Sequence, residues 1–355
     1  MKAVFLPGIT LLNQLRYPHK FLFIGVLFFV PLLLLGYFLI QEVNQRIHFM
    51  EQEQPGIEYI ARLRKVIQPM QQHRGISSAI ISGGNSLRSE LEKQAASIDQ
   101  AFVNLQEIDN RFRLTLSTKN RLTILQSDWL TLKRNLNSYT QVESFQHHTV
   151  IITNMLEFIH HLASTSNLIL SSELDTYYLI DTLVNHLPKL TEEAGQSRAL
   201  GSSIIAQGEF TPENWQKLLA ASQRIAEAEK SLIRGMDVVL QENQSLIDNL
   251  KYPADRALSS TSIYRQTLDK MLKEKTVTVN LDSFFNQATQ TIDNVFNLFD
   301  IVAPSLNKLI ESRISYYKFI RTTTIIVMLI VLFSVIYIFT AFYLSVMRAI
   351  TELRM

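Results

Sequence analysis

Two long apolar stretches without a single charged side chain, residues 21–40 and 322–344, lie near the two ends of this 355-residue chain. The hydrocarbon core of a bilayer is about 30 Å thick, and a helix needs about 20 apolar residues to cross it. Both stretches reach that length, so each is predicted to span a membrane. Residues 41–321 between them are mostly polar and are expected to fold outside the bilayer.

The basic residues that flank the first stretch indicate its orientation. Lys2, Arg16 and Lys20 precede it, whereas Arg46 alone falls within the twenty residues that follow. Because cytoplasmic flanks are rich in Lys and Arg, residues 1–20 are predicted to be cytoplasmic and residues 41–321 periplasmic, in a two-pass protein of the bacterial inner membrane. The apolar run is longer than the roughly 7–15 residues of a secretory signal and lacks its small-residue cleavage site, which favours an uncleaved anchor.

The amino-acid composition limits which kinds of protein this chain can be. The chain has no cysteine, so the predicted periplasmic region uses no disulfide. A net charge of +2, with acidic and basic residues interleaved, predicts no nucleic-acid partner. Glycine and proline are sparse, at 11 and 9 residues, which favours long helices over many short strands.

The expected fold is all-α, with two transmembrane helices flanking about eight helices in two stacked four-helix bundles. The longest segments exceed the length of one ordinary bundle, so we expect the bundles end to end with the longest helices running through both. Gly208 is predicted to end a helix, Thr211 and Pro212 to start one, and Pro253 to start another. The helical segments are 41–82, 86–109, 119–137, 144–170, 174–207, 212–247, 253–274 and 281–344.

An internal repeat supports two modules. Residues 72–84 match residues 196–208 at a constant offset of 124, with Gln, Arg, Ser, Ile, Ile and Gly in common. The spacing of each copy is that of a buried helix seam, and an arginine stands in the middle of each. The two seams are Leu63, Ile67, Met70, Arg74, Ser77 and Ile81, and Leu187, Thr191, Ala194, Arg198, Gly201 and Ile205.

These two arginines are the main candidates for a site. A buried guanidinium needs a carboxylate, carbonyl groups or a bound anion, because an unpaired buried charge costs several kcal/mol. Small neighbours leave room beside each arginine, so a binding site for a small anionic or polar ligand is one reading. The alternatives are ion pairs with an acid such as Asp99, Glu193 or Asp175, or an arginine that reaches solvent at a helix end. The candidate binding residues are Arg74, Arg198, Ser77, Ser78, Gln72 and Ser202.

The run from Gln71 to Ser78 resembles the signature of NIT domains, which are nitrate- and nitrite-sensing modules. The stretch 165–188 is similar to the sensor region of bacterial transmembrane receptors, among them chemoreceptors, sensor histidine kinases and diguanylate cyclases. The resemblance implies a helical double-bundle sensor that binds nitrate or nitrite through arginines. Arg74 is the arginine of this sequence to which the resemblance assigns that role. Two departures are His73, where NIT sequences commonly have glutamate, and residues 171–173, which replace the usual Asp-Pro-Asp/Glu.

Other chemistry finds little support. Paired histidines at 147–148 and 160–161 suggest a metal, but adjacent helix residues diverge by about 100° and no acidic or cysteine cluster completes a site. No nucleophile–base set, phosphate-binding loop or metalloprotease spacing is present. The sequence therefore predicts no enzyme, no catalytic residue, no metal and no cofactor.

Residues 345–355 resemble the opening of a HAMP linker, in which Arg348, Ile350 and Leu353 fit the pattern and the usual proline is missing. The chain is thus expected to hold an input and a transmembrane relay, with the output, such as chemotaxis, a histidine kinase or a diguanylate cyclase, supplied elsewhere. We expect a homodimer, because long parallel helices bury apolar faces across a two-fold axis. The alternative is a ligand-free periplasmic protein with a structural or interaction role.

Overall fold

In the computed structural model, which describes residues 2–81, 87–171, 173–274 and 279–352, the regular elements are all helical, as predicted. Short helical turns η2–η5 lie at 136–138, 168–170, 182–186 and 244–246. The main helices are α1 (Lys2–Asn13), α2 (Tyr17–Ile81), α3 (Arg88–Phe112), α4 (Lys119–Asn135), α5 (Gln141–Thr165), α6 (Leu174–Asp181), α7 (Leu187–Gln207), α8 (Pro212–Glu242), α9 (Ile247–Glu274) and α10 (Leu281–Glu352). The predicted break at Gly83 and Gly84, Ser172 and Leu353 lie outside the described residues.

The chain forms two compact units, and α2 and α10 each contribute to both. The terminal unit contains residues 1–50 and 312–355, which include both apolar stretches. The central unit contains residues 51–311 and carries the candidate site.

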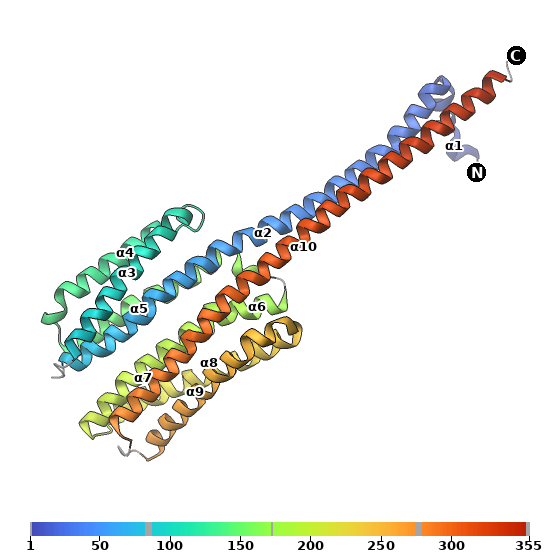
Figure 1. The fold of residues 1–355 in the computed structure, drawn as a ribbon. Coiled ribbons are helices and arrows are strands. Elements are labelled where there is room, and N and C mark those ends of the chain that lie inside the picture. The colour runs from blue at the N-terminus through green and yellow to red at the C-terminus, as the bar shows by residue number, and fades with distance from the viewer. Residues whose placement is uncertain (1, 82–86, 172, 275–278, 353–355) are drawn as a thin grey trace. The chain divides into compact units, whose positions relative to one another are not determined.

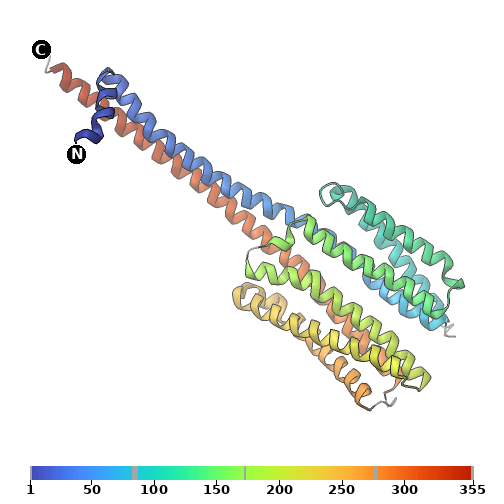
Figure 2. The same ribbon diagram turned by 180° about the vertical axis from the view of Figure 1, so that it is seen from behind.

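The central unit consists of two helical bundles that lie side by side (Figures 1 and 2). One bundle contains the second half of α2 with α3, α4 and α5, and the other contains α6 to α9 with the first part of α10. The end-to-end arrangement expected from helix length is therefore wrong. Polar contacts join α2 to an antiparallel α10 along the boundary: Gln54–Asn307 at 3.4 Å, Arg64–Asp300 at 2.8 Å and Gln68–Asp293 at 3.0 Å.

The reason lies in the burial of α2 between residues 56 and 78. Tyr59, Leu63 and Val66 are buried, but so are Arg64 and Ile67 on neighbouring faces. A helix that is buried on more than one face needs neighbours on more than one side, and α2 finds them in both bundles. The two predicted seams are confirmed, since every member is buried except Ile81 and Ile205 at their ends, which are half-buried.

The helix ends that surround α7 and α8 are also as predicted. Gly208 closes α7 in the left-handed conformation with φ of 69°, where glycine has no steric penalty. Thr211 caps α8 by accepting a hydrogen bond from the Asn214 backbone N–H at 3.1 Å, and Pro212 is the first helical residue.

The predicted helix start at Pro253 is wrong, because α9 begins at Ile247 and continues through the proline. Asn243 provides the local start signal: its side chain accepts a hydrogen bond from the Ser245 backbone N–H at 3.2 Å. Leu246 and Leu250 are buried, so packing favours the extra helical turns upstream of the proline.

In the terminal unit, α2 and α10 are the two described helices that are long and apolar enough to cross a membrane. Aromatic side chains pack between them, with the Phe21 ring edge-on to Phe339, Phe342 and Tyr343. Gly36 lies directly against the Met328 side chain, with no room for a Cβ. Small residues at such contacts let two apolar helices approach closely.

We therefore expect Gly36→Val to destabilise the terminal unit by about 1–3 kcal/mol, because its side chain overlaps Met328 and overpacks the contact. The measurement is thermal unfolding of the full chain in detergent micelles. Met328→Ala added to Gly36→Val should restore much of the loss. The overpacking explanation fails if the double variant is no more stable than Gly36→Val.

Candidate functional site

Helices α2 and α7 bring the two predicted arginines next to each other inside the central unit. Arg74 and Arg198 are only 1% and 4% exposed. Each guanidinium lies over a glycine of the opposite helix: a Cβ on Gly195 would lie 3.0 Å from Arg74 Nη2, and one on Gly75 would lie 3.2 Å from Arg198 Nη2. A side chain at either glycine would crowd the arginine, so the small residues noted in the sequence make room for the pair.

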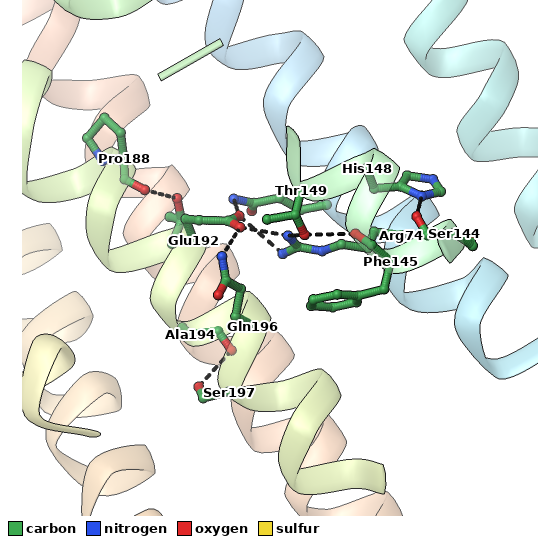
Figure 3. A network of polar contacts seen from close by, with 12 residues as sticks. Arg74, Ser144, Phe145, His148, Thr149, Pro188, Glu192, Ala194, Gln196 and Ser197 are labelled. Atoms are coloured by element: carbon green, nitrogen blue, oxygen red, sulfur yellow. Dashed lines mark hydrogen bonds and ion pairs between the residues drawn. The ribbon is translucent and has the colours of Figure 1, made fainter. Parts of the chain in front are cut away.

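Arg74 forms a two-pronged ion pair with Glu192 of α7 (Figure 3). Its Nη1 lies 2.6 Å from Glu192 Oε1, and its Nη2 lies 3.1 Å from Oε2. Nη1 also donates to Thr149 Oγ1 at 3.0 Å, and the guanidinium lies over the Phe145 ring, 5.0 Å from its centre. The forked geometry matches a planar oxyanion, here a carboxylate of the chain itself.

Two glutamines hold the Glu192 carboxylate in place. Gln71 Nε2 donates to Oε2 at 3.0 Å, and Gln196 Nε2 donates to Oε1 at 2.7 Å. With the two bonds from Arg74, each carboxylate oxygen accepts two hydrogen bonds, and the residue is only 5% exposed. The result is an anchored buried carboxylate.

An acid therefore does pair with Arg74, but it is none of the three that the sequence suggested. Asp99 accepts hydrogen bonds from Trp129 and Lys133, Glu193 pairs with Arg224, and Asp175 accepts from Thr176 and Asn243. Glu192 and Glu193 are adjacent on one helix, so they point about 100° apart, and only Glu192 faces α2.

Arg198 has a different environment. Its Nη1 donates to Thr289 Oγ1 at 2.8 Å, and its guanidinium lies over the Phe285 ring, 4.8 Å from the centre. The described residues give it no ion pair. Burial, and then the positive charge of Arg74, lower the pKa of Arg198 to about 10. At neutral pH it is still charged, so it is a buried cation that needs an anion.

The surroundings of the two arginines repeat. Phe145 and Thr149 of α5 contact Arg74, and Phe285 and Thr289 of α10 contact Arg198 in the same roles. Arg198 follows Arg74 by 124 positions, and Phe285 and Thr289 follow Phe145 and Thr149 by 140. A constant offset within each pair of helices supports the predicted internal repeat. Position 192 corresponds to Gln68, so the carboxylate stands in only one of the two halves.

The other predicted site residues lie around this pair. Ser77 Oγ donates to the Arg74 carbonyl at 3.1 Å and lies 3.3 Å from Ser144 Oγ; Ser78 is buried, and Gln72 is half-buried. Ser202, one turn after Arg198, has a buried Oγ to which the described residues give no hydrogen-bond partner. The sequence did not predict four residues of this site, namely Gln71, Thr149, Glu192 and Thr289. Their spacing carried no signal, because their roles depend on which helices become neighbours.

A buried histidine pair lies beside Arg74. His148 Nδ1 lies 2.7 Å from the Ser144 carbonyl, which can only accept, so Nδ1 carries the proton. His148 Nε2 must then accept from His73 Nδ1, also at 2.7 Å. Burial lowers the pKa of His73 to about 4 and of His148 to about 3, with further lowering by Lys133 for His73 and by His73 for His148. Both imidazoles are neutral at pH 7.

The metal reading of the histidines gains no support. Within the described part of the chain, no group of three or more His, Cys, Asp or Glu side chains is placed to hold a metal ion. His147 stacks on Tyr139 instead, and His161 contacts the Leu116 carbonyl at 3.0 Å.

The fold and the site define a class of protein: an all-helical domain whose sequence lies between two apolar stretches and which contains two neighbouring buried arginines. The model of a family described as nitrate and nitrite sensing (NIT) matches residues 65–301. That range is more than half of the sequence and includes the arginine pair. The chain belongs to the NIT family.

Among solved structures, the chain is similar to the structure of the NasR transcription antiterminator. The identity is 15%, the TM-score is 0.60, and the match covers 80% of this chain and 76% of that chain. At this identity the likeness shows the fold alone. No curated protein matches the sequence.

Proposed function

We propose that this protein is a membrane receptor that senses a small anion, with nitrate or nitrite first, through Arg74 and Arg198. The observation that carries the proposal is Arg198, a buried guanidinium to which the described residues give no ion pair, next to Arg74. A bound anion would supply the missing negative charge. Membership of the nitrate and nitrite sensing family supports the same ligand class.

The chemistry of the site suits a small planar oxyanion. Arg198 uses only one of its five N–H donors in a described hydrogen bond, and Arg74 has donors besides those bonded to Glu192 and Thr149. Ser202, on the same helix face as Arg198, adds a buried hydroxyl that has no hydrogen-bond partner among the residues that the structure describes. Guanidinium forks match nitrate as they match a carboxylate, because both present oxygens in one plane.

For the membrane arrangement we propose the topology that the sequence favours. Residues 21–40 and 322–344 span the inner membrane, residues 1–20 and 345–355 are cytoplasmic, and residues 41–321 are periplasmic. The support is the length and apolar character of α2 and α10, together with the basic flank before residue 21.

Helix α10 suits the relay of a signal, because it contains Thr289 at the site and continues without a break to Glu352. An anion that binds one packing of α2, α7 and α10 better than another would shift α10 by about 1–2 Å. The HAMP-like segment would pass this shift, in a homodimer, to a cytoplasmic output such as a chemotaxis protein, kinase or cyclase. No catalysis by this chain is needed.

The test is thermal unfolding of the full chain in detergent with nitrate and with chloride at equal ionic strength. Nitrate is expected to stabilise the protein by about 2.7 kcal/mol at one hundred times its Kd, and Arg198→Gln should abolish this stabilisation. Arg224→Gln is the matched control, because Arg224 is 41% exposed and pairs with Glu193, whose side chain diverges by about 100° from that of Glu192.

Equal stabilisation of Arg198→Gln and the wild type by nitrate would contradict the assignment of Arg198. A normally folded wild type that responds to no anion would favour the alternative, a ligand-free protein with a structural or interaction role.

A further inference from the structure

The buried side chains around Arg74 and Arg198 carry more positive than negative charge. Arg74 and Arg198 contribute two positive charges, and Glu192 contributes one negative charge. The neighbouring His73 and His148 are neutral at pH 7. Asp293 of α10 acts on Arg198 more strongly than Glu192 does, but it is half-buried and accepts a hydrogen bond from Gln68, so it lies at the solvated edge of the cluster. Counted over the buried side chains alone, the cluster therefore has a net charge of +1.

Glu192 is expected to keep its position when a ligand binds, because its carboxylate is firmly held. Its two oxygens accept four hydrogen bonds, from Arg74, Gln71 and Gln196, and the side chain is almost fully buried. Displacing it would leave a buried carboxylate unpaired, which costs several kcal/mol. A ligand thus meets a site whose charge is already half neutralised.

We propose that Glu192 is a specificity-determining residue that restricts this site to singly charged anions. The inference rests on the proposed anion site and adds the selection by charge. One monovalent anion brings the buried cluster to zero, whereas a divalent anion would leave an uncompensated negative charge in a poorly solvated place. Proteins commonly achieve specificity in this way, by making the binding of the wrong ligand unfavourable.

The internal repeat supports this role. Gln68 is the repeat counterpart of Glu192 on α2, and it is neutral. If both halves carried a carboxylate, the two arginines would be fully paired and no anion would be needed. If neither did, the cluster would carry a charge of +2 and would suit a divalent anion. The carboxylate in one half alone gives the intermediate value.

The experiment is isothermal titration of the full chain in detergent with nitrate and with sulfate at constant ionic strength. The wild type is expected to bind nitrate more tightly than sulfate. Glu192→Gln should lower the ratio of the sulfate Kd to the nitrate Kd by at least about tenfold, because the cluster then carries a charge of +2. Glu193→Gln, a neighbour that pairs with Arg224 away from the cluster, should leave the ratio unchanged.

A second pair of variants tests the same rule if Glu192→Gln does not fold, which circular dichroism would reveal. Ser202→Asp adds a carboxylate one turn from Arg198 and brings the cluster to zero, whereas Ser202→Asn adds a side chain of the same shape without the charge. Nitrate is expected to bind Ser202→Asp at least about tenfold more weakly than Ser202→Asn.

The outcomes separate the two proposals. If the wild type and Glu192→Gln bind nitrate with the same preference over sulfate, or if the two Ser202 variants bind nitrate equally, selection by charge is overturned while the anion site stands. If the folded wild type binds neither nitrate nor sulfate, the anion site itself is overturned, and the selection with it.

Discussion

Replacing Arg74 with methionine is expected to lower the free energy of unfolding of the central unit by about 3–5 kcal/mol, because it leaves the Glu192 carboxylate buried and without its cation. Gln71 and Gln196 still donate to that carboxylate, but neutral donors replace only part of the interaction. The measurement is urea-induced unfolding of the full chain in detergent, followed by the fluorescence of Trp129 and Trp215, which both lie in the central unit.

Three further variants show whether the buried charge is the cause. Arg74→Met combined with Glu192→Leu should recover most of the loss, since no unpaired charge remains. Arg198→Met should change the free energy by no more than about 1 kcal/mol or raise it, because the described residues give Arg198 no ion pair. Arg111→Met, which removes an exposed ion pair with Glu58, should cost about 1 kcal/mol or less. A loss no larger for Arg74→Met than for Arg111→Met would contradict this account.

Acidification from pH 7 to pH 5 is expected to destabilise the central unit through the His73–His148 pair. The folded protein holds both imidazoles neutral, with pKa values of about 4 and 3, whereas an unfolded histidine has a pKa of about 6.5. Above pH 6.5 neither state is protonated, so the pair adds no pH dependence. Below it, the unfolded chain binds protons that the folded chain does not, which costs about 2 kcal/mol per imidazole at pH 5.

The measurement is the free energy of unfolding at pH 7 and pH 5 for the wild type and for His148→Gln, which removes one of the two imidazoles. The variant should lose less stability than the wild type between the two pH values, by about 2 kcal/mol. His147→Gln is the matched control, because His147 is the exposed neighbour on the same helix and should leave the difference unchanged. Identical losses for His148→Gln and the wild type would show that the pair does not govern the acid response.

The helices themselves followed closely from local sequence. Gly208, Thr211 and Pro212 act through backbone conformation and capping, which depend on a few neighbouring residues, and they stand where predicted. Pro253 was misread because burial of Leu250 outweighs the local preference of a proline for the first helical turn. The side-by-side packing of the bundles was missed for a related reason: helix length shows how far a helix reaches, whereas its neighbours depend on all of its buried faces.

By itself, the sequence determined that the chain is helical, that two apolar stretches frame it, and that Arg74 and Arg198 stand in repeated buried seams. Periodicity and hydrophobicity are local properties, so they can be read directly from the amino-acid sequence. Only the tertiary structure decided that Glu192, rather than Asp99, Asp175 or Glu193, pairs with Arg74, and that Arg198 meets Thr289 and Phe285. Such pairings depend on the register and rotation of helices whose contacting residues lie about 90 to 120 positions apart in the sequence, where a shift of one residue turns a side chain by about 100°.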